Sequence, residues 1–249
     1  KLAVRCACGP ALKSVGCGQI LLCDKCRRPY YRKIRRRALA AVTARLAEAS
    51  TSWHRGGRRR GKRPMVVLVT LTIPRMEGDR AMPLMERQRR LVDGWRKLRQ
   101  WLHRRIGAFP FVCLPELTPG SDGTGHLHYH AICVWPWWDW QESQAEWRRA
   151  TGLSDANPPD MRVVNDPRRA AHYVAKYATK GAASNREGMT ADLLADFVAT
   201  YYGKRRISPS VGWWVPMPPP RCPCCGAPIA VTERPAPVVE AAAAWRARR

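Results

Sequence analysis

Three histidines occupy alternate positions in one short stretch of the chain, and a carboxylate precedes them. The histidines are His126, His128 and His130, and Glu116 stands before the glycine-rich segment 119–125. Alternate residues of a β-strand point to the same face of a sheet, so the three imidazoles can share a face. Two neutral imidazoles and a carboxylate can hold a divalent ion and leave coordination positions open for a phosphoryl oxygen.

The segment 111–135 predicts two strands joined by a hairpin, and their register decides whether these side chains meet. When the strands pair in register, Glu116 lies opposite His128, whereas a slip by one residue places the two on opposite faces of the sheet. In the same register Cys113 and Cys133 lie on the other face, where we expect them to be small core residues.

Candidate nucleophiles follow on a predicted helix. Asp166 and Pro167 suit the N-cap and the first helical position, and Gly181 suits the residue after the last turn. Four residues share or border one face of this helix: Tyr173, Lys176, Tyr177 and Lys180. A tyrosine that attacks a phosphodiester forms a phosphotyrosyl bond and frees a hydroxyl group. Because the ordinary pKa of a phenol is about 10, a polarised phosphate or a nearby lysine must assist the attack.

Other segments predict the elements that position these residues. The stretch 65–73 is apolar on both faces and ends at Pro74, which predicts a central strand. A long amphipathic helix is expected at 83–106, ending at Gly107. The remaining expected elements are a strand at 161–164, a helix at about 190–202, and a basic helix at 30–50 with Pro29 at or just before its first turn.

The composition indicates a polyanionic partner. The 249-residue chain carries 44 Lys and Arg against 19 Asp and Glu, which gives a net charge of +25. Residues 1–63 alone hold 18 basic and 2 acidic side chains. We therefore expect nucleic acid as the partner, with a solvated charged face as the alternative for the basic helix. The predicted DNA-binding residues are Arg35, Arg36, Arg37, Arg58, Arg59 and Arg60.

Ten cysteines without a secretory signal favour metal ligation over disulfides and predict a cytoplasmic setting in a prokaryotic host. The close cysteine pairs have the spacing of zinc knuckles, and free thiols are the alternative. The predicted zinc ligands are Cys6, Cys8, Cys17, Cys23, Cys26, Cys222 and Cys225. With Cys224, the two ends of the chain hold enough cysteines for two four-cysteine sites if the C-terminal tail folds back.

The ordered motifs resemble the HUH endonucleases, and among them the rolling-circle replication initiators (Rep proteins). Val69-Thr70-Leu71-Thr72 looks like their first motif, and His128-Tyr129-His130 looks like their histidine–hydrophobic–histidine motif. The segment 173–180 is similar to the tyrosine motif of the two-tyrosine branch, which some rolling-circle transposases share. The resemblance covers about residues 65–210, and the cysteine-rich segments lie outside it.

The resemblance implies an α+β fold in which helices flank a central five-stranded antiparallel sheet, an RRM-like palm. It implies Mg²⁺ or Mn²⁺ at His128, His130 and Glu116, which leaves His126 as a neighbour. It also implies nicking of single-stranded or hairpin origin DNA, with a covalent 5′-phosphotyrosine and a free 3′-hydroxyl group. Tyr177 is then the expected first nucleophile, and Tyr173 is the second, used when the strand is rejoined.

Three domains are expected. They are a cysteine-rich, zinc-binding and basic arm at 1–63, an endonuclease domain at 64–215, and a proline-rich linker with a second cysteine cluster and a tail at 216–249. We expect a host helicase as a partner for unwinding, and no membrane partner. The alternatives are a transposase or relaxase of the same superfamily, or a zinc-knuckle nucleic-acid-binding protein without catalysis.

Overall fold

The chain forms two compact units, one of residues 1–18 with 216–249 and the other of residues 19–215. This computed structural model describes residues 2–6, 9–13, 24–55, 64–119, 125–135, 140–179, 190–201, 206–217 and 230–231. The larger unit contains the sheet, the predicted histidine strand and the predicted tyrosine helix.

A five-stranded antiparallel sheet with the order β8-β3-β7-β6-β9 forms the centre of the larger unit. Its strands are β3 (Met65–Thr72), β6 (Phe111–Thr118), β7 (His126–Trp135), β8 (Asp160–Val163) and β9 (Ser208–Pro209). β3 has a neighbour on each side, which confirms the predicted central strand. The predicted α+β fold class is confirmed with it.

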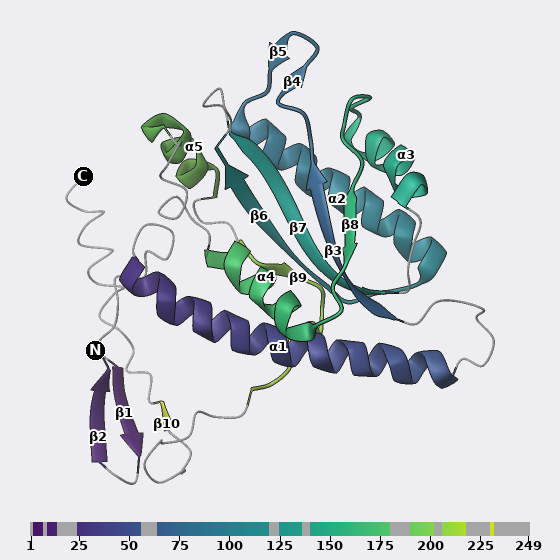
Figure 1. The fold of residues 1–249 in the computed structure, drawn as a ribbon. Helices are drawn as coiled ribbons and strands as arrows, with labels where there is room; N and C mark the ends of the chain where they lie inside the picture. The colour runs from purple at the N-terminus through teal and green to yellow at the C-terminus, as the bar shows by residue number, and fades with distance from the viewer. Residues whose placement is uncertain are drawn as a thin grey trace. The chain divides into compact units, whose positions relative to one another are not determined.

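Helices cover both faces of this sheet (Figure 1). α1 (Asp24–Arg55) and α4 (Pro167–Thr179) lie on one face, and α2 (Leu84–Ile106) lies on the other. α2 also packs against α3 (Trp140–Thr151) and α5 (Ala191–Tyr201). A short hairpin, β4 (Met76–Glu77) with β5 (Arg80–Ala81), connects β3 to α2.

The alternation of side chains along the strands divides the core into two parts. On β7, Ile132 and Val134 belong to the part beneath α1 and α4, and Cys133 belongs to the part beneath α2. Cys113 and Cys133 are buried free cysteines in the α2 part, so the prediction that they are small core residues is confirmed. Burial raises the pKa of both thiols above the ordinary value, which keeps them protonated.

α2 confirms the amphipathic helix predicted at 83–106. Gly107 ends it with φ 83°, and the Gly107 N–H donates a hydrogen bond to the His103 carbonyl at 3.0 Å. Its buried face is formed by Leu84, Arg87, Leu91, Gly94, Trp95, Leu98 and Leu102. None of the helices that the structure describes combines the length and the apolar character of a membrane span.

α1 is longer than the helix predicted at 30–50, because it begins at Asp24 and ends at Arg55. Pro29 lies inside the helix, so the predicted start was wrong. A proline in the second turn removes one backbone hydrogen bond, and tertiary packing of the following turns can outweigh that loss. The buried residues of those turns pack against the core part beneath α4: Ile34, Ala38, Ala41 and Val42.

The two compact units divide the chain differently from the predicted domains. The predicted boundary at 215/216 coincides with the end of the larger unit. α1 was assigned to a separate arm at 1–63, yet it belongs to the larger unit and packs along α4. The basic helix is therefore part of the body that carries the tyrosines.

The smaller unit contains a three-stranded antiparallel sheet that joins the two ends of the chain. β1 (Leu2–Cys6) lies between β2 (Gly9–Lys13) and β10 (Ala230–Val231). The C-terminal segment thus folds back onto the N-terminal strand, as the hypothesis of shared cysteine sites requires. Zinc binding itself stays a prediction: Cys6 ends β1 and Cys26 lies in α1, whereas the other predicted ligands, Cys8, Cys17, Cys23, Cys222 and Cys225, lie outside the described residues.

Gly94 marks a close approach between α2 and α3. A Cβ atom at this position would lie 2.8 Å from Thr151 Cγ2 and 2.9 Å from Trp147 Cζ3. Trp147 is fully buried, and its Nε1–H donates a hydrogen bond to the Thr72 carbonyl at the end of β3, at 3.1 Å. The absence of a side chain at Gly94 therefore lets Trp147 support the end of the strand.

Gly94→Ala is expected to lower the free energy of unfolding by about 1–2 kcal/mol. Overpacking costs about 1–3 kcal/mol, and the helix preference of alanine over glycine offsets up to about 1 kcal/mol of it. Urea unfolding followed by circular dichroism measures the change. Val92→Ala, at an exposed position of the same helix, is the control and should change stability by less than about 0.5 kcal/mol. A Gly94→Ala protein as stable as the wild type would contradict the close packing.

Candidate active site

The hairpin of β6 and β7 has the predicted register. Glu116 is the partner of His128, and Leu114 is the partner of His130. The side chain of Glu116 leans diagonally to the next histidine, so that His130 Nε2 lies 2.5 Å from Glu116 Oε2. Both residues are buried, with 4% and 6% of their surface exposed. Glu116 and His130 thus form a hydrogen-bonded pair with little access to water.

Two threonines of β3 hold the histidines from the other side, and sequence reasoning did not assign them this role. Thr70 is the register partner of His130, and Thr72 is the register partner of His128. Their hydroxyl oxygens lie 3.2 Å and 2.8 Å from the Nδ1 atoms of these two rings. A hydroxyl group can donate or accept, so it suits either tautomer of the imidazole. The Thr-x-Thr spacing, which matches the His-x-His spacing across the ladder, was the available signal.

The three histidine rings follow one another along the strand. The centroids of His126 and His128 are 6.1 Å apart with the planes at 15°, and those of His128 and His130 are 6.1 Å apart at 35°. His128 Nε2 lies 3.3 Å from the Thr118 hydroxyl oxygen. His128 and His130 each have Nδ1 beside a threonine of β3, so their Nε2 atoms face the Glu116 side.

α4 begins as predicted and carries the tyrosines to this strand. The Arg168 N–H donates a hydrogen bond to Asp166 Oδ1 at 2.8 Å, which confirms Asp166 as the N-cap residue before Pro167. The ring of Tyr177 stacks on the ring of His130, with centroids 3.8 Å apart and planes at 9°. The structure therefore brings a predicted nucleophile into direct contact with a predicted metal ligand.

Tyr173 extends this stack along the helix. Its ring centroid lies 6.2 Å from that of Tyr177, and the two planes are at 9°. Tyr177 is buried, whereas Tyr173 is partly exposed. The two phenols are thus parallel, one helical turn apart, on the face predicted from their spacing.

Burial raises the pKa of Tyr177 to about 12, and the negative charge of Glu116 and the neighbouring Tyr173 add to the effect. Arg162 of β8 acts in the opposite direction. Arg162 was not among the predicted site residues, and its Nη2 lies 2.8 Å from Asp160 Oδ2. At neutral pH Tyr177 is therefore a protonated phenol that needs assistance to act as a nucleophile.

The two predicted lysines differ in what the structure describes. The Lys176 Nζ lies 5.2 Å from the centroid of the Tyr177 ring, which places a positive charge over the phenol. Lys180 lies outside the described residues. Lys176 alone therefore carries the described contact of this pair.

The donor set of the histidine strand has the right chemistry for a divalent ion, although its present geometry is closed. Among the described residues, no group of three or more His, Cys, Asp and Glu side chains is arranged to hold a metal ion as it stands. Two atoms that bind one ion at about 2.0–2.2 Å lie about 3 Å apart, so Glu116 Oε2 and His130 Nε2, at 2.5 Å, would have to separate slightly. His128, His130 and Glu116 therefore fit an ion only after that adjustment.

The predicted DNA-binding arginines lie in different surroundings. Arg35 lines a cavity between α1 and α4, and Arg36 is exposed. The guanidinium carbon of Arg37 lies 4.7 Å from the ring centroid of Trp214. Arg58, Arg59 and Arg60 lie outside the described residues.

Residues 66–182 match a family model described as a replication-associated protein of the ORF2 type. The matched segment is a little under half of the chain and runs from β3 beyond the end of α4. It includes the threonines, Glu116, the histidines and both tyrosines of the site, and it excludes α1. The match supports a replication initiator. No curated protein and no solved structure matches the chain.

Proposed function

We propose that the protein initiates rolling-circle replication by nicking single-stranded or hairpin origin DNA through tyrosine transesterification, as an HUH-type endonuclease with two tyrosines. The observation that carries this proposal is the stacking of Tyr177 on His130, itself paired with Glu116. A phenol, two imidazoles and a carboxylate meet there on one face of the sheet. The family match to a replication-associated protein favours initiation over transposition or conjugative transfer, which use the same chemistry.

The nicking step transfers a phosphodiester bond from DNA to protein. The Oη atom of Tyr177 attacks phosphorus, a P–Oη bond forms, and the bond from phosphorus to the 3′ oxygen breaks. The phenol loses its proton and the departing 3′ oxygen gains one, so the products are a 5′-phosphotyrosine and a 3′-hydroxyl group. No bond energy is lost to hydrolysis, so the strand can be rejoined later.

Two cations of the chain lie near the developing charge. The Lys176 Nζ is 5.2 Å from the Tyr177 ring centroid, and Arg162 lowers the cost of ionising the phenol. Both favour the phenolate, against the effects of burial and of Glu116. Lys176 and Arg162 therefore act through Tyr177 and are positioning residues.

His128, His130 and Glu116 would hold the catalytic ion, Mg²⁺ or Mn²⁺. When bound, such an ion supplies Lewis-acid polarisation of a phosphoryl oxygen. Thr70 and Thr72 would orient the two imidazoles by their hydrogen bonds to Nδ1, as outer partners of metal-ligating histidines do.

Tyr173 would serve as the second nucleophile, when a round of replication is closed. It is parallel to Tyr177 at 6.2 Å between ring centroids, so both can reach one phosphate position in turn. We further propose structural Zn²⁺ on the cysteine-rich segments and unwinding by a host helicase. These last two parts rest on sequence alone.

The proposal is tested by incubating the protein with single-stranded oligonucleotides that together cover the DNA of its replicon, in the presence of Mn²⁺. A covalent adduct that survives a denaturing gel, together with a free 3′-hydroxyl group that a polymerase extends, is the expected result. Binding of the same oligonucleotides without any adduct would instead favour a nucleic-acid-binding protein without catalysis.

A further inference from the structure

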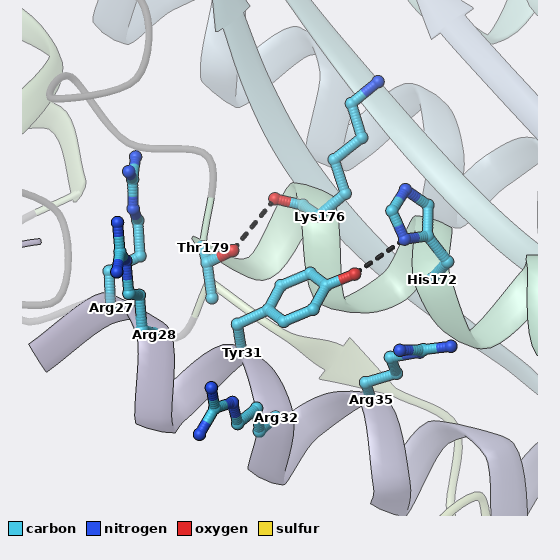
Figure 2. Close-up of a pocket in the computed structure, with 8 residues that line it drawn as sticks. All are labelled: Arg27, Arg28, Tyr31, Arg32, Arg35, His172, Lys176 and Thr179. Carbon is cyan, nitrogen blue, oxygen red and sulfur yellow. Dashed lines mark hydrogen bonds between the residues drawn. The ribbon is translucent and has the colours of Figure 1, made fainter.

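A cavity of about 500 Å³ lies between α1 and α4, outside the stack of tyrosines and histidines (Figure 2). Its lining residues come from these two helices alone: Arg27, Arg28, Tyr31, Arg32, Arg35, His172, Lys176 and Thr179. Five of the eight carry a positive charge, and no carboxylate is among them. A packed protein interior rarely gathers like charges without a purpose, because each repels the others. The cavity is therefore suited to an anion.

Tyr31 and His172 join the two walls of the cavity. The Tyr31 hydroxyl oxygen lies 2.6 Å from His172 Nδ1, as the dashed line in Figure 2 marks. When this hydroxyl donates to Nδ1 of a neutral imidazole, the ring carries its own hydrogen on Nε2. His172 then offers an N–H donor to a bound anion in addition to the charged groups.

α4 presents two neighbouring faces, and the cavity occupies the one beside the tyrosines. His172, Lys176 and Thr179 are spaced i, i+4 and i+7 and face α1, whereas Tyr173 and Tyr177 face the histidine strand. Lys176 belongs to both surroundings, because it lines the cavity and its Nζ lies 5.2 Å from the Tyr177 ring centroid. The cavity and the candidate nucleophile are thus adjacent.

We propose that this cavity binds backbone phosphates of the single DNA strand next to the phosphodiester that Tyr177 attacks. The inference rests on the proposed function and deepens it. Guanidinium groups bind phosphate oxygens through paired hydrogen bonds, and the lining supplies them from successive turns of one rigid helix. Because the family match begins at residue 66, this binding surface comes from a helix that the matched segment lacks.

Arg28→Gln with Arg32→Gln tests the proposal through the salt dependence of binding to a fluorescent single-stranded oligonucleotide of mixed sequence. Each phosphate contact contributes about 0.7 to the slope of log K against log salt, so the slope should fall by about 1.4. At 0.1 M salt, affinity should fall on the order of 20-fold. Both arginines are exposed, so the fold should be unaffected, and circular dichroism checks this.

The matched control removes the same charge from the other face of the sheet. Arg89 and Arg104 are exposed residues of α2, and neither lines the cavity. Arg89→Gln with Arg104→Gln should leave the slope within about 0.3 of the wild-type value if specific contacts carry the binding. Equal losses in the two double variants would overturn the proposal, since they would indicate a diffuse positive field.

A neutral phosphate locates the contact. In the wild type, single methylphosphonates placed along the oligonucleotide should weaken binding at one or two positions. In the Arg28→Gln, Arg32→Gln protein the same substitutions should have no further effect, as in a double-mutant cycle. Additive losses would contradict contact between these groups. These binding measurements need no cleavage, so failure of the adduct assay leaves the cavity test standing, and an adduct formed at an unchanged rate and affinity by the variant would reject the cavity alone.

Discussion

Tyr177→Phe is expected to abolish the covalent protein–DNA adduct, with a loss of initial nicking rate on the order of 10³-fold or more. The variant lacks the oxygen that forms the bond to phosphorus. It keeps the ring that stacks on His130 at 3.8 Å, so the fold and the shape of the site should persist. Single-turnover nicking with Mn²⁺, followed on denaturing gels, measures the loss.

Tyr173→Phe is the matched control, because it removes the same hydroxyl group one turn away on the same helix. It should leave the first nick within about threefold of the wild-type rate, since it is not the ring in contact with His130. Rejoining of a second strand should be lost instead. If Tyr173→Phe abolished the first nick and Tyr177→Phe did not, the order of the two nucleophiles would be reversed.

His128→Ala combined with His130→Ala is expected to reduce nicking on the order of 10³-fold or more while leaving oligonucleotide affinity within about threefold. The two rings would supply ligands for the catalytic ion, and they lie away from the arginine-lined cavity. Nicking rates as a function of Mn²⁺ concentration, with affinity measured in EDTA, separate the two effects.

His126→Ala is the control for this pair. His126 lies on the same strand and its ring is stacked on that of His128, yet it is not a favoured ligand. Its loss should change nicking by less than about tenfold. Parallel loss of affinity and nicking in the double variant would mean that His128 and His130 support the strand and bind no ion.

The histidine strand and its partner were predictable because their pattern is local. Alternation placed His128 and His130 on one face, and a glycine-rich hairpin left few registers for Glu116. The diagonal hydrogen bond from His130 to Glu116 was not predictable, since the side-chain rotamer of Glu116 depends on what packs above it. Thr70 and Thr72 required the pairing of β3 with β7, which joins segments far apart in the sequence.

Features that depend on packing between distant elements were missed. β9 consists of Ser208 and Pro209 and has no periodic pattern, so only its pairing with β6 reveals it. α1 has an ordinary basic sequence, and its charges indicated a free arm. Its small buried residues Ala38 and Ala41 let it approach α4 closely, which places the arginines beside the tyrosine helix. Hydrophobic periodicity identifies a buried face but does not identify what covers it.

The parallel rings of Tyr173 and Tyr177 have a mechanical consequence. Both phenols are fixed to one rigid helix, and one helical turn advances about 5.4 Å. A shift of α4 would move both rings together and could not exchange one for the other at a fixed position. The exchange must therefore be made by the DNA, which has to translate by about one turn of the helix between the first and second reactions. The protein then holds both nucleophiles stationary, and strand movement sets the timing of termination.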